Sequence, residues 1–299
     1  MIRLRAGTGA ALVLTVMSAG AFGAAQARPP AAGTIVGRVR LTGNAPGNAV
    51  IRMGVDPLCS KANAGRRVFQ RTVVASRDGG LADVFVRLEG RFTATPVPAD
   101  PVIVDQQACI YLPRVIGART GQTLLVKNSD TLLHNVHALS TGGNPFNVGQ
   151  PLRGQVFRHQ LKEEAGMLRL KCDVHRWMTA YIGVVDHPYF AVTDSGGSFT
   201  IRDVPTGTRT VRAWHERYGE LTVSVKVTSG ATATAYFAYS GLEKTPPPPD
   251  TMSRLSFKWI LAALAVAALA PICFAFGWRL IPARAATAEV GTVVPWAIA

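Results

Sequence analysis

Short strand-like runs of apolar residues, many of them alternating with polar ones, recur between residues 34 and 239. Residues 83–90, 122–128, 180–186 and 220–227 are examples, and clusters of glycine, proline, asparagine and aspartate separate such runs. Successive side chains point to opposite faces of a strand, so a period of two indicates strands. Runs of this length bounded by turn residues are typical of β-sandwiches. Because no stretch in this range keeps a period of 3.6, we predict an all-β body.

The N-terminal segment has the pattern of a secretory signal peptide over residues 1–27. Arg3 and Arg5 precede an apolar run over residues 10–21, which is too short to span a bilayer comfortably. Small residues at Ala25 and Ala27 supply a cleavage site. The alternative is an uncleaved anchor. We therefore expect an exported body, in a compartment where disulfides persist.

A second apolar segment lies near the C-terminus. Residues 259–278 contain no charge and have Trp259 and Trp278 at their ends, which is typical of a membrane span. We predict a transmembrane helix over residues 256–280, a cytoplasmic tail over 281–299 and a stiff proline-rich linker over 242–255. With the signal peptide fixing the orientation, the body is expected in the periplasm or on the cell surface, anchored to the cytoplasmic membrane.

The chain is strongly basic, with 32 Lys and Arg against 18 Asp and Glu and a net charge of +14. The signal peptide carries +2 and residues 251–299 carry +3, which leaves +9 on the exported body. This charge suits an acidic partner, although a solvated basic surface without a partner explains it equally well. We expect no nucleic acid partner outside the cytoplasm.

Metal-binding residue types gather around one predicted strand end. Cys172, His175 and Met178 follow the run at 167–171 with the spacing C-x-x-H-x-x-M, and His134 begins another predicted strand. Two imidazoles and a thiolate with a weak axial thioether are the ligands of blue-copper electron-transfer sites. A single loop can supply three of these ligands, and a neighbouring strand can supply His134.

Each of these residues has an ordinary structural explanation. An exported cysteine is often half of a disulfide or a small buried apolar residue, and single histidines and methionines are common in cores. Zinc accepts cysteine and histidine, but a thioether is a poor zinc ligand. Taken together, the spacing, the β setting and the export signal favour one copper ion.

The stretch from about Tyr111 to Asp186 resembles the cupredoxins, most closely the plastocyanin and amicyanin group. The resemblance is carried, in family order, by Tyr111-Leu112-Pro113, Gly121 to Asn128, His134-Asn135-Val136-His137 and the motif Cys172-x-x-His175-x-x-Met178. It implies a Greek-key β-sandwich with a type 1 copper held by His134, Cys172, His175 and Met178. It also implies that Asn135 braces the ligand loop. Arg176 departs from the family, in which a proline commonly follows the second histidine.

His137 is a competing ligand. Along a strand His134 and Val136 share one face while Asn135 and His137 share the other, so only one of the two histidines can face the site. The resemblance selects His134. His159, His187 and His215 lack matching spacing and are expected to be structural.

The flanking sequences suggest further β modules. Residues 190–201 and 203–215 resemble the carboxypeptidase regulatory-like, transthyretin-like sandwich, which is related to carbohydrate-binding folds. We expect an N-terminal β module at 28–95, a copper domain at 96–187 and this sandwich at 188–241. The alternative is a single sandwich interrupted by the copper domain. Carbohydrate binding around Trp214 is a weaker idea, since a fold does not imply a function.

Three cysteines remain. Cys273 lies in the predicted span, and a disulfide between Cys59 and Cys109 is the favoured interpretation. Two separate thiols, or a second soft metal site that includes Met53, are the alternatives.

No nucleophile–base pair, phosphate loop or carboxylate dyad is apparent in the sequence, and a metal with four protein ligands leaves no open position for a substrate. We therefore predict a one-electron carrier and not an enzyme. Its donor and acceptor would be redox proteins such as a cytochrome, a dehydrogenase or an oxidase. The alternatives are copper delivery, and adhesion or carbohydrate binding with a structural copper. As in cupredoxins, we expect the ring edge of His175 to reach the surface beside Trp177 and Arg176 and to exchange electrons there.

Overall fold

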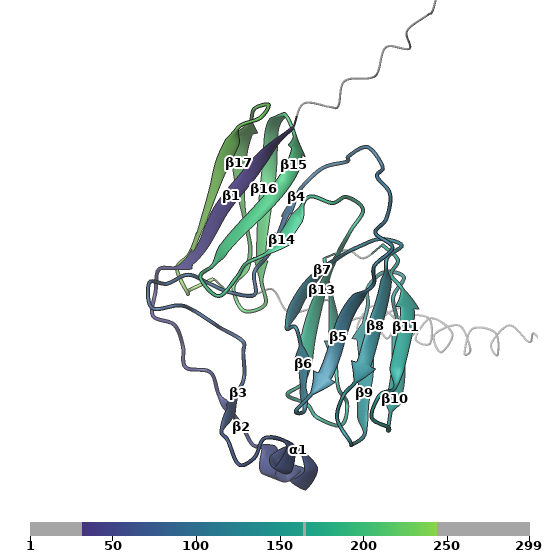
Figure 1. The fold of residues 1–299 in the computed structure, drawn as a ribbon. Helices are drawn as coiled ribbons and strands as arrows, with labels where there is room; N and C mark the ends of the chain where they lie inside the picture. The colour runs from purple at the N-terminus through teal and green to yellow at the C-terminus, as the bar shows by residue number, and fades with distance from the viewer. Residues whose placement is uncertain (1–31, 164–165, 244–299) are drawn as a thin grey trace, which may run out of the picture.

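The computed structural model describes residues 32–163 and 166–243, and these form two β-sandwiches and a small separate segment (Figure 1). The predicted signal peptide, transmembrane helix and tail, with nearly all of the linker, lie outside the described residues. Within the described ranges no helix has the length and apolarity needed to cross a bilayer. The all-β expectation is confirmed for these ranges, apart from a short helix described below.

The first sandwich spans residues 102–185 and is called the inserted sandwich. One sheet has the order β10-β9-β12-β13-β7 and the other has the order β11-β8-β5-β6. The strands of the first sheet are β10 (Phe146–Gln150), β9 (His134–Leu139), β12 (Met167–Lys171), β13 (Thr179–Val185) and β7 (Val115–Arg119). Those of the second are β11 (Val156–Gln160), β8 (Thr123–Asn128), β5 (Val102–Gln107) and β6 (Ile110–Leu112).

The alternating sequence pattern explains how these strands build a core. In β8, Leu124, Val126 and Asn128 are buried while the residues between them are more exposed. β9 buries His134, Val136 and Ala138 in the same way. The apolar ones, Leu124, Val126, Val136 and Ala138, belong to one buried cluster shared by both sheets. His134 shares their face of β9 and is fully buried at the very start of the strand.

The second sandwich takes strands from both sides of the insertion and is called the split sandwich. Its sheets have the orders β15-β1-β18 and β14-β4-β16-β17. The strands are β15 (Ser198–Pro205), β1 (Ala32–Leu41), β18 (Thr232–Tyr239), β14 (Phe190–Val192), β4 (Phe85–Leu88), β16 (Gly207–His215) and β17 (Gly219–Val227). β1 lies between β15 and β18, and β4 lies between β14 and β16. Strands from the ranges 28–95 and 188–241 therefore form one sandwich. This corresponds to the alternative of a single sandwich interrupted by the copper domain.

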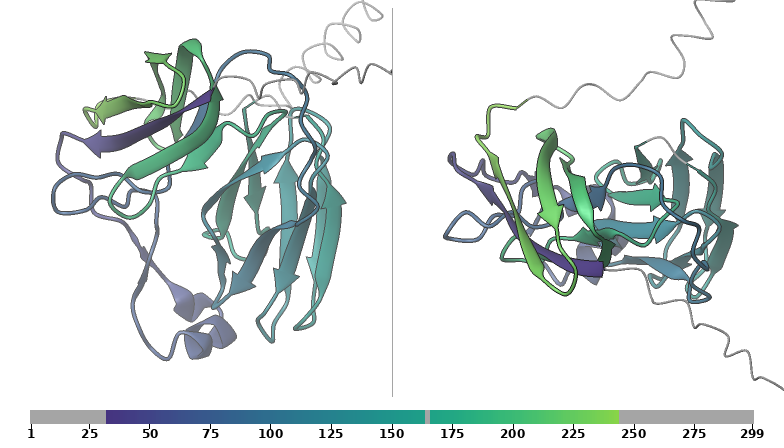
Figure 2. Two further views of the ribbon diagram at one scale, coloured as in Figure 1. Left: turned by 45° about the horizontal axis from the view of Figure 1, so that its top comes forward. Right: turned by 90° about the horizontal axis from the view of Figure 1, so that it is seen from above.

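The two sandwiches pack directly against each other (Figure 2). The ring of Phe85 from β4 lies over Gly117 and Gly183 of β7 and β13, where an added Cβ would come within 2.9 Å and 2.4 Å of the ring atoms, respectively. β13 is buried along most of its length because one face joins the core and the other meets the split sandwich. This explains why residues 180–186 read as a nearly continuous apolar run.

Residues 50–69 leave the split sandwich and are called the cap. The cap contains β2 (Val50–Ile51), the 3-10 helix η1 (Met53–Val55), α1 (Pro57–Ala62) and β3 (Val68–Phe69). Figure 1 shows α1 at one end of the inserted sandwich, away from the split sandwich. Ile51, Met53 and Cys59 join the core of the inserted sandwich. The all-β prediction missed α1, although Asp56 before Pro57 is a helix-start signal.

Candidate metal centre

Three of the predicted ligands meet at the end of the inserted sandwich beneath the cap. Nδ1 of His134 lies 3.1 Å from Nδ1 of His175, and Sγ of Cys172 lies 3.8 Å from Nδ1 of His175. The ligand atoms of all three lie within 4.8 Å of one another. Their exposed fractions are 0%, 2% and 1% for His134, His175 and Cys172. The structure thus places two imidazoles and a thiol at one buried point.

The loop between β12 and β13 carries three of the four predicted ligands. Met178 lies directly before β13 and is buried in the core that contains Cys172. The backbone N–H of Cys172 donates to the carbonyl of Met178 (3.2 Å), and that of Met178 donates to the carbonyl of His175 (2.9 Å). The N–H of His175 also lies 3.3 Å from Sγ of Cys172. These bonds close the loop into a tight turn.

Asn135 lies where a brace for this loop is expected. Its Oδ1 accepts a hydrogen bond from the backbone N–H of Asp173 at 2.8 Å, within the loop. The hydroxyl of Tyr111 donates to the carbonyl oxygens of Asn135 (2.6 Å) and Lys171 (3.3 Å). β6, β9 and β12 are therefore tied together beside Cys172.

The remaining histidines lie away from this point. His137 is on the opposite face of β9, where its Nδ1 contacts Oδ2 of Asp173 at 2.9 Å, as the alternation predicts. His159 in β11 contacts the side chain of Asn144. His187 stacks on Tyr189, and His215 stacks on Tyr218. None of the four belongs to a metal-competent group among the described residues.

Two carboxylates that the sequence analysis did not single out hold the outer nitrogens of both imidazoles. Nε2 of His134 lies 2.8 Å from Oδ2 of Asp130, and Nε2 of His175 lies 3.1 Å from Oδ2 of Asp56. A carboxylate that accepts the Nε2 proton leaves Nδ1 as the lone-pair nitrogen and fixes the ring orientation, the usual support of a metal-bound histidine. Both Nδ1 atoms then face Cys172.

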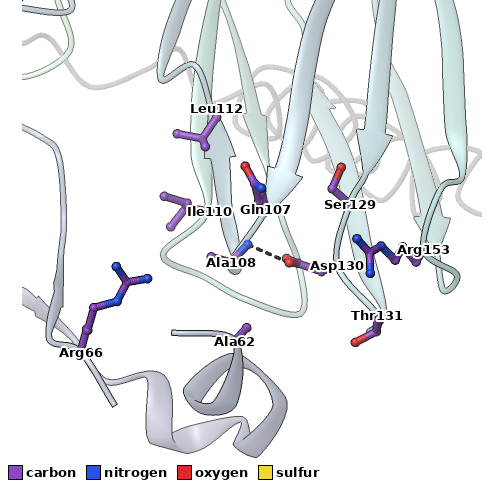
Figure 3. Close-up of a pocket in the computed structure, with 10 residues that line it drawn as sticks. All are labelled: Ala62, Arg66, Gln107, Ala108, Ile110, Leu112, Ser129, Asp130, Thr131 and Arg153. Atoms are coloured by element: carbon purple, nitrogen blue, oxygen red, sulfur yellow. Dashed lines mark hydrogen bonds between the residues drawn. The ribbon is translucent and has the colours of Figure 1, made fainter. Parts of the chain in front are cut away.

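Asp130 is itself held by the turn between β5 and β6. The backbone N–H groups of Ala108 and Cys109 donate to its two carboxylate oxygens at 2.7 and 2.8 Å. Figure 3 shows the bond from Ala108 at the wall of a pocket of about 440 Å³, with Arg66 and Arg153 on different sides. Burial raises the pKa of Asp130, but His134 and these N–H groups outweigh it and lower the pKa overall.

The electrostatics favour a thiolate at Cys172. Burial alone raises the pKa of this thiol, but hydrogen bonds with His134 and His175 and with the backbone of His175 and Asn135 bring it to about 6. Burial lowers the pKa of both imidazoles, and their carboxylate and Cys172 partners raise it above the ordinary value. A thiolate is the form of cysteine that binds metals.

The structure joins Cys59 to Cys109, the pair favoured from the sequence. The alternative with two separate thiols is therefore wrong, and while the bond is intact neither cysteine offers a thiolate. The disulfide lies beside the metal centre, because Sγ of Cys59 is 3.5 Å from Nε2 of His175.

The expectation that the ring edge of His175 reaches the surface is wrong. His175 is only 2% exposed, because Asp56 and the disulfide cover its Nε2 edge. Trp177 packs against the ring with centroids 5.1 Å apart, and its Nε1 donates to the carbonyl of Cys109. Asp56 lies 119 residues before His175, so no local pattern indicates that the two side chains meet.

The donor set fits copper. Two imidazoles and a thiolate are ligand types of copper electron-transfer sites, and His134, Cys172 and His175 would hold the ion, with the thioether of Met178 in the same buried loop as a further soft donor. The contacts from Asp130 to His134 and from Asp56 to His175 are of the kind that orients metal-bound imidazoles.

Comparison with solved structures finds cupredoxins. A copper-containing nitrite reductase from Thermus scotoductus SA-01 is 21% identical, with 31% of this chain and 25% of that chain covered and a TM-score of 0.27. A copper(I) form of an amicyanin mutant is 20% identical over 33% of this chain and 97% of its own, with a TM-score of 0.25. A purple cupredoxin from Nitrosopumilus maritimus is 25% identical over 28% of this chain and 98% of its own, with a TM-score of 0.24. This chain thus spans about a quarter of the nitrite reductase. No protein-family model and no curated protein sequence matches it.

Proposed function

We propose that this protein is a one-electron carrier with a single type 1 copper held by His134, Cys172, His175 and Met178. The observation that carries the proposal is the convergence of two Nδ1 atoms and one Sγ at a buried point. Copper bound there would supply a Cu(I)/Cu(II) couple. On this proposal the inserted sandwich is a plastocyanin- or amicyanin-like cupredoxin domain, and the split sandwich is a carboxypeptidase regulatory-like module.

The residues around the ligands support electron transfer. Asp130 and Asp56 hold both imidazoles in one orientation, and Asn135 holds the loop. A site that keeps its geometry needs little reorganisation when it gains or loses an electron. Four protein ligands also leave no position for a substrate, which supports a carrier and not an enzyme.

Burial argues against the two alternatives. A copper-delivery protein must release its metal to a partner, whereas His134, Cys172, His175 and Met178 are all at most 2% exposed. For carbohydrate binding, Trp214 was the suggested platform. Its ring instead packs against Tyr181 between the sandwiches, with centroids 5.0 Å apart, which gives this tryptophan a structural role.

The visible spectrum of the copper-loaded protein tests the proposal. We expect a strong thiolate-to-Cu(II) band and a reversible potential. Cys172→Ser should abolish the band, because a hydroxyl cannot replace the thiolate at copper. His134→Ala should also abolish it, and His137→Ala, on the opposite face of β9, is the matched control and should leave it nearly unchanged. Colourless binding of Cu(I) alone would instead indicate delivery, and a loss confined to His137→Ala would overturn the ligand assignment.

We further propose that the body is exported and anchored to the cytoplasmic membrane by residues 256–280, where it exchanges electrons with a cytochrome, a dehydrogenase or an oxidase. The support is the sequence of the two chain ends. Truncation after Asp250 should release a soluble copper protein. Recovery of the truncated protein with washed membranes would contradict the tether.

A further inference from the structure

Few contacts hold the cap against the metal centre. Its strands β2 and β3 pair only with each other within the described residues. Where the chain leaves the split sandwich, paired hydrogen bonds between Asn48 and Val73 join the two connecting segments. Buried residues of the cap are few, and Val55 and Leu58 face solvent at 73% and 51% exposure. The apolar packing of the cap on the inserted sandwich is limited to Ile51, Met53, Cys59 and the partly buried Val68.

The specific attachments of the cap to the inserted sandwich lie around His175. One is the disulfide from Cys59 to Cys109, at the turn between β5 and β6. Another is the hydrogen bond from Nδ2 of Asn63 to the carbonyl of Ala108, at 3.1 Å in the same turn. The third is the contact from Asp56 to Nε2 of His175. The same turn donates two N–H groups to Asp130, which holds His134.

Asp56 joins the cap to the ligand with one side chain. Its Oδ1 accepts from the N–H groups of Leu58 and Cys59 and so caps α1, while its Oδ2 contacts His175. The helix that carries Cys59 thus begins at the residue that orients the ligand. The disulfide fixes the position of α1, and α1 fixes the position of the carboxylate.

From these contacts we propose that the cap is a disulfide-pinned lid over the metal centre, in which Asp56 is the positioning residue for His175. A dithiol reductant would open the lid. It gives two electrons and two protons to the S–S bond, leaving two thiols, and becomes a disulfide itself. The inference rests on the proposed function only in assigning His175 as a ligand, because the covering of His175 is a property of the metal-free protein.

The test without metal measures how fast diethyl pyrocarbonate acylates His175, followed by peptide mass spectrometry. In the wild type His175 should react slowly, while His137, whose side chain is 29% exposed, serves as the internal reference. The double variant Cys59→Ala/Cys109→Ala should react at least about ten-fold faster at His175, since local opening of the lid no longer meets a covalent restraint. Both cysteines are replaced because a single remaining thiol could be oxidised by dissolved oxygen to a disulfide with Cys172.

Asp56→Asn separates positioning from helix capping. Asparagine is as good an N-cap as aspartate, so α1 should remain, while the carboxylate partner of His175 is lost. We expect faster acylation of His175 and, in the copper-loaded protein, a raised reduction potential and about 10- to 100-fold weaker copper binding. Lys61→Gln, which removes an exposed charge from α1 outside these contacts, is the matched control and should match the wild type.

Each outcome decides the inference. His175 acylation at the wild-type rate in the double variant would overturn the pinned lid, and an unchanged rate and potential in Asp56→Asn would overturn the role of Asp56. If His159 in β11 also became faster, the double variant would be unfolded, and dithiol-treated wild type then gives the deciding rate. Absence of a thiolate band in the loaded wild type would defeat the proposed function alone, because the acylation rates need no metal.

Discussion

Arg114 and Glu216 form a buried, two-pronged ion pair that joins the two sandwiches. Nε and Nη2 of Arg114 lie 2.5 and 2.7 Å from the carboxylate oxygens of Glu216. The two side chains are only 10% and 9% exposed. Nη1 of Arg114 also donates to the carbonyl of Thr179, the residue after Met178. The pair thus connects the β16–β17 turn to the end of the ligand loop.

Breaking this pair on one side should be costly. Glu216→Ala leaves the guanidinium of Arg114 buried without its carboxylate, and we expect the free energy of unfolding to fall by about 3 kcal/mol. The double variant Arg114→Met/Glu216→Ala should recover part of that loss, because no buried charge remains. Urea unfolding of the three proteins measures both changes. Equal stability of Glu216→Ala and wild type would show that the pair does not hold the interface.

The packing of Phe85 on Gly183 predicts a steric effect. A Cβ at Gly183 would lie 2.4 Å from the ring of Phe85, so Gly183→Ala must push the two sandwiches apart or strain β13. We expect a loss of about 1–3 kcal/mol. Gly149→Ala is the matched control, since a Cβ there meets nothing within 4 Å, and its effect should stay within about 0.5 kcal/mol. Thermal unfolding of both variants checks the contrast.

His215 predicts acid sensitivity of the split sandwich. Burial, together with the charges of Arg114 and Arg217, lowers its pKa from 6.5 to about 4. The unfolded chain therefore binds a proton between these values that the folded chain does not, so stability is present above about pH 6.5 and is lost as the pH falls towards 4. The loss amounts to about 3 kcal/mol near pH 4.

The comparison of wild type with His215→Asn isolates this contribution. The amide oxygen of asparagine can replace Nδ1 as the acceptor for the N–H of Arg217, but it does not titrate. Urea unfolding at several pH values should give a shallower pH dependence for the variant. Parallel curves for the two proteins would mean that other groups cause the acid sensitivity.

Arg176 lies beside His175 and is exposed, so it is placed to attract an acidic redox partner. Arg176→Glu should slow association with that partner, and the difference should shrink as salt rises, because exposed charges are screened. The visible spectrum should hardly change. The control is Arg77→Glu, which makes the same change of charge at an exposed turn residue of the split sandwich. Stopped-flow rates that are equal for both variants at low salt would place the docking site elsewhere.

The local sequence pattern was enough to predict the strands and most residues of the candidate site. The alternation of apolar residues marks β8 and β9, and a short apolar run marks β13, because strand formation is largely a property of neighbouring residues. Cys172, His175 and Met178 lie in one short loop, so their spacing alone indicates that they can meet. The alternation of faces along β9 showed that only one of His134 and His137 can face the site, and the resemblance to cupredoxins selected His134.

Tertiary structure decided which distant segments meet. β1 lies between β15 and β18, whose sequences contain nothing that specifies β1 as a partner. Asp56 has the sequence signal of a helix N-cap, but its contact with His175 joins residues 119 positions apart. A carboxylate has the same local sequence signature whether it meets water or an imidazole, so only the folded chain shows that the cap covers His175. The sequence by itself indicated which residue types could gather at a metal centre, because ligand spacing in a loop is local, and the tertiary structure decided that His134, Cys172 and His175 lie together and are closed to solvent, because distant segments cover them.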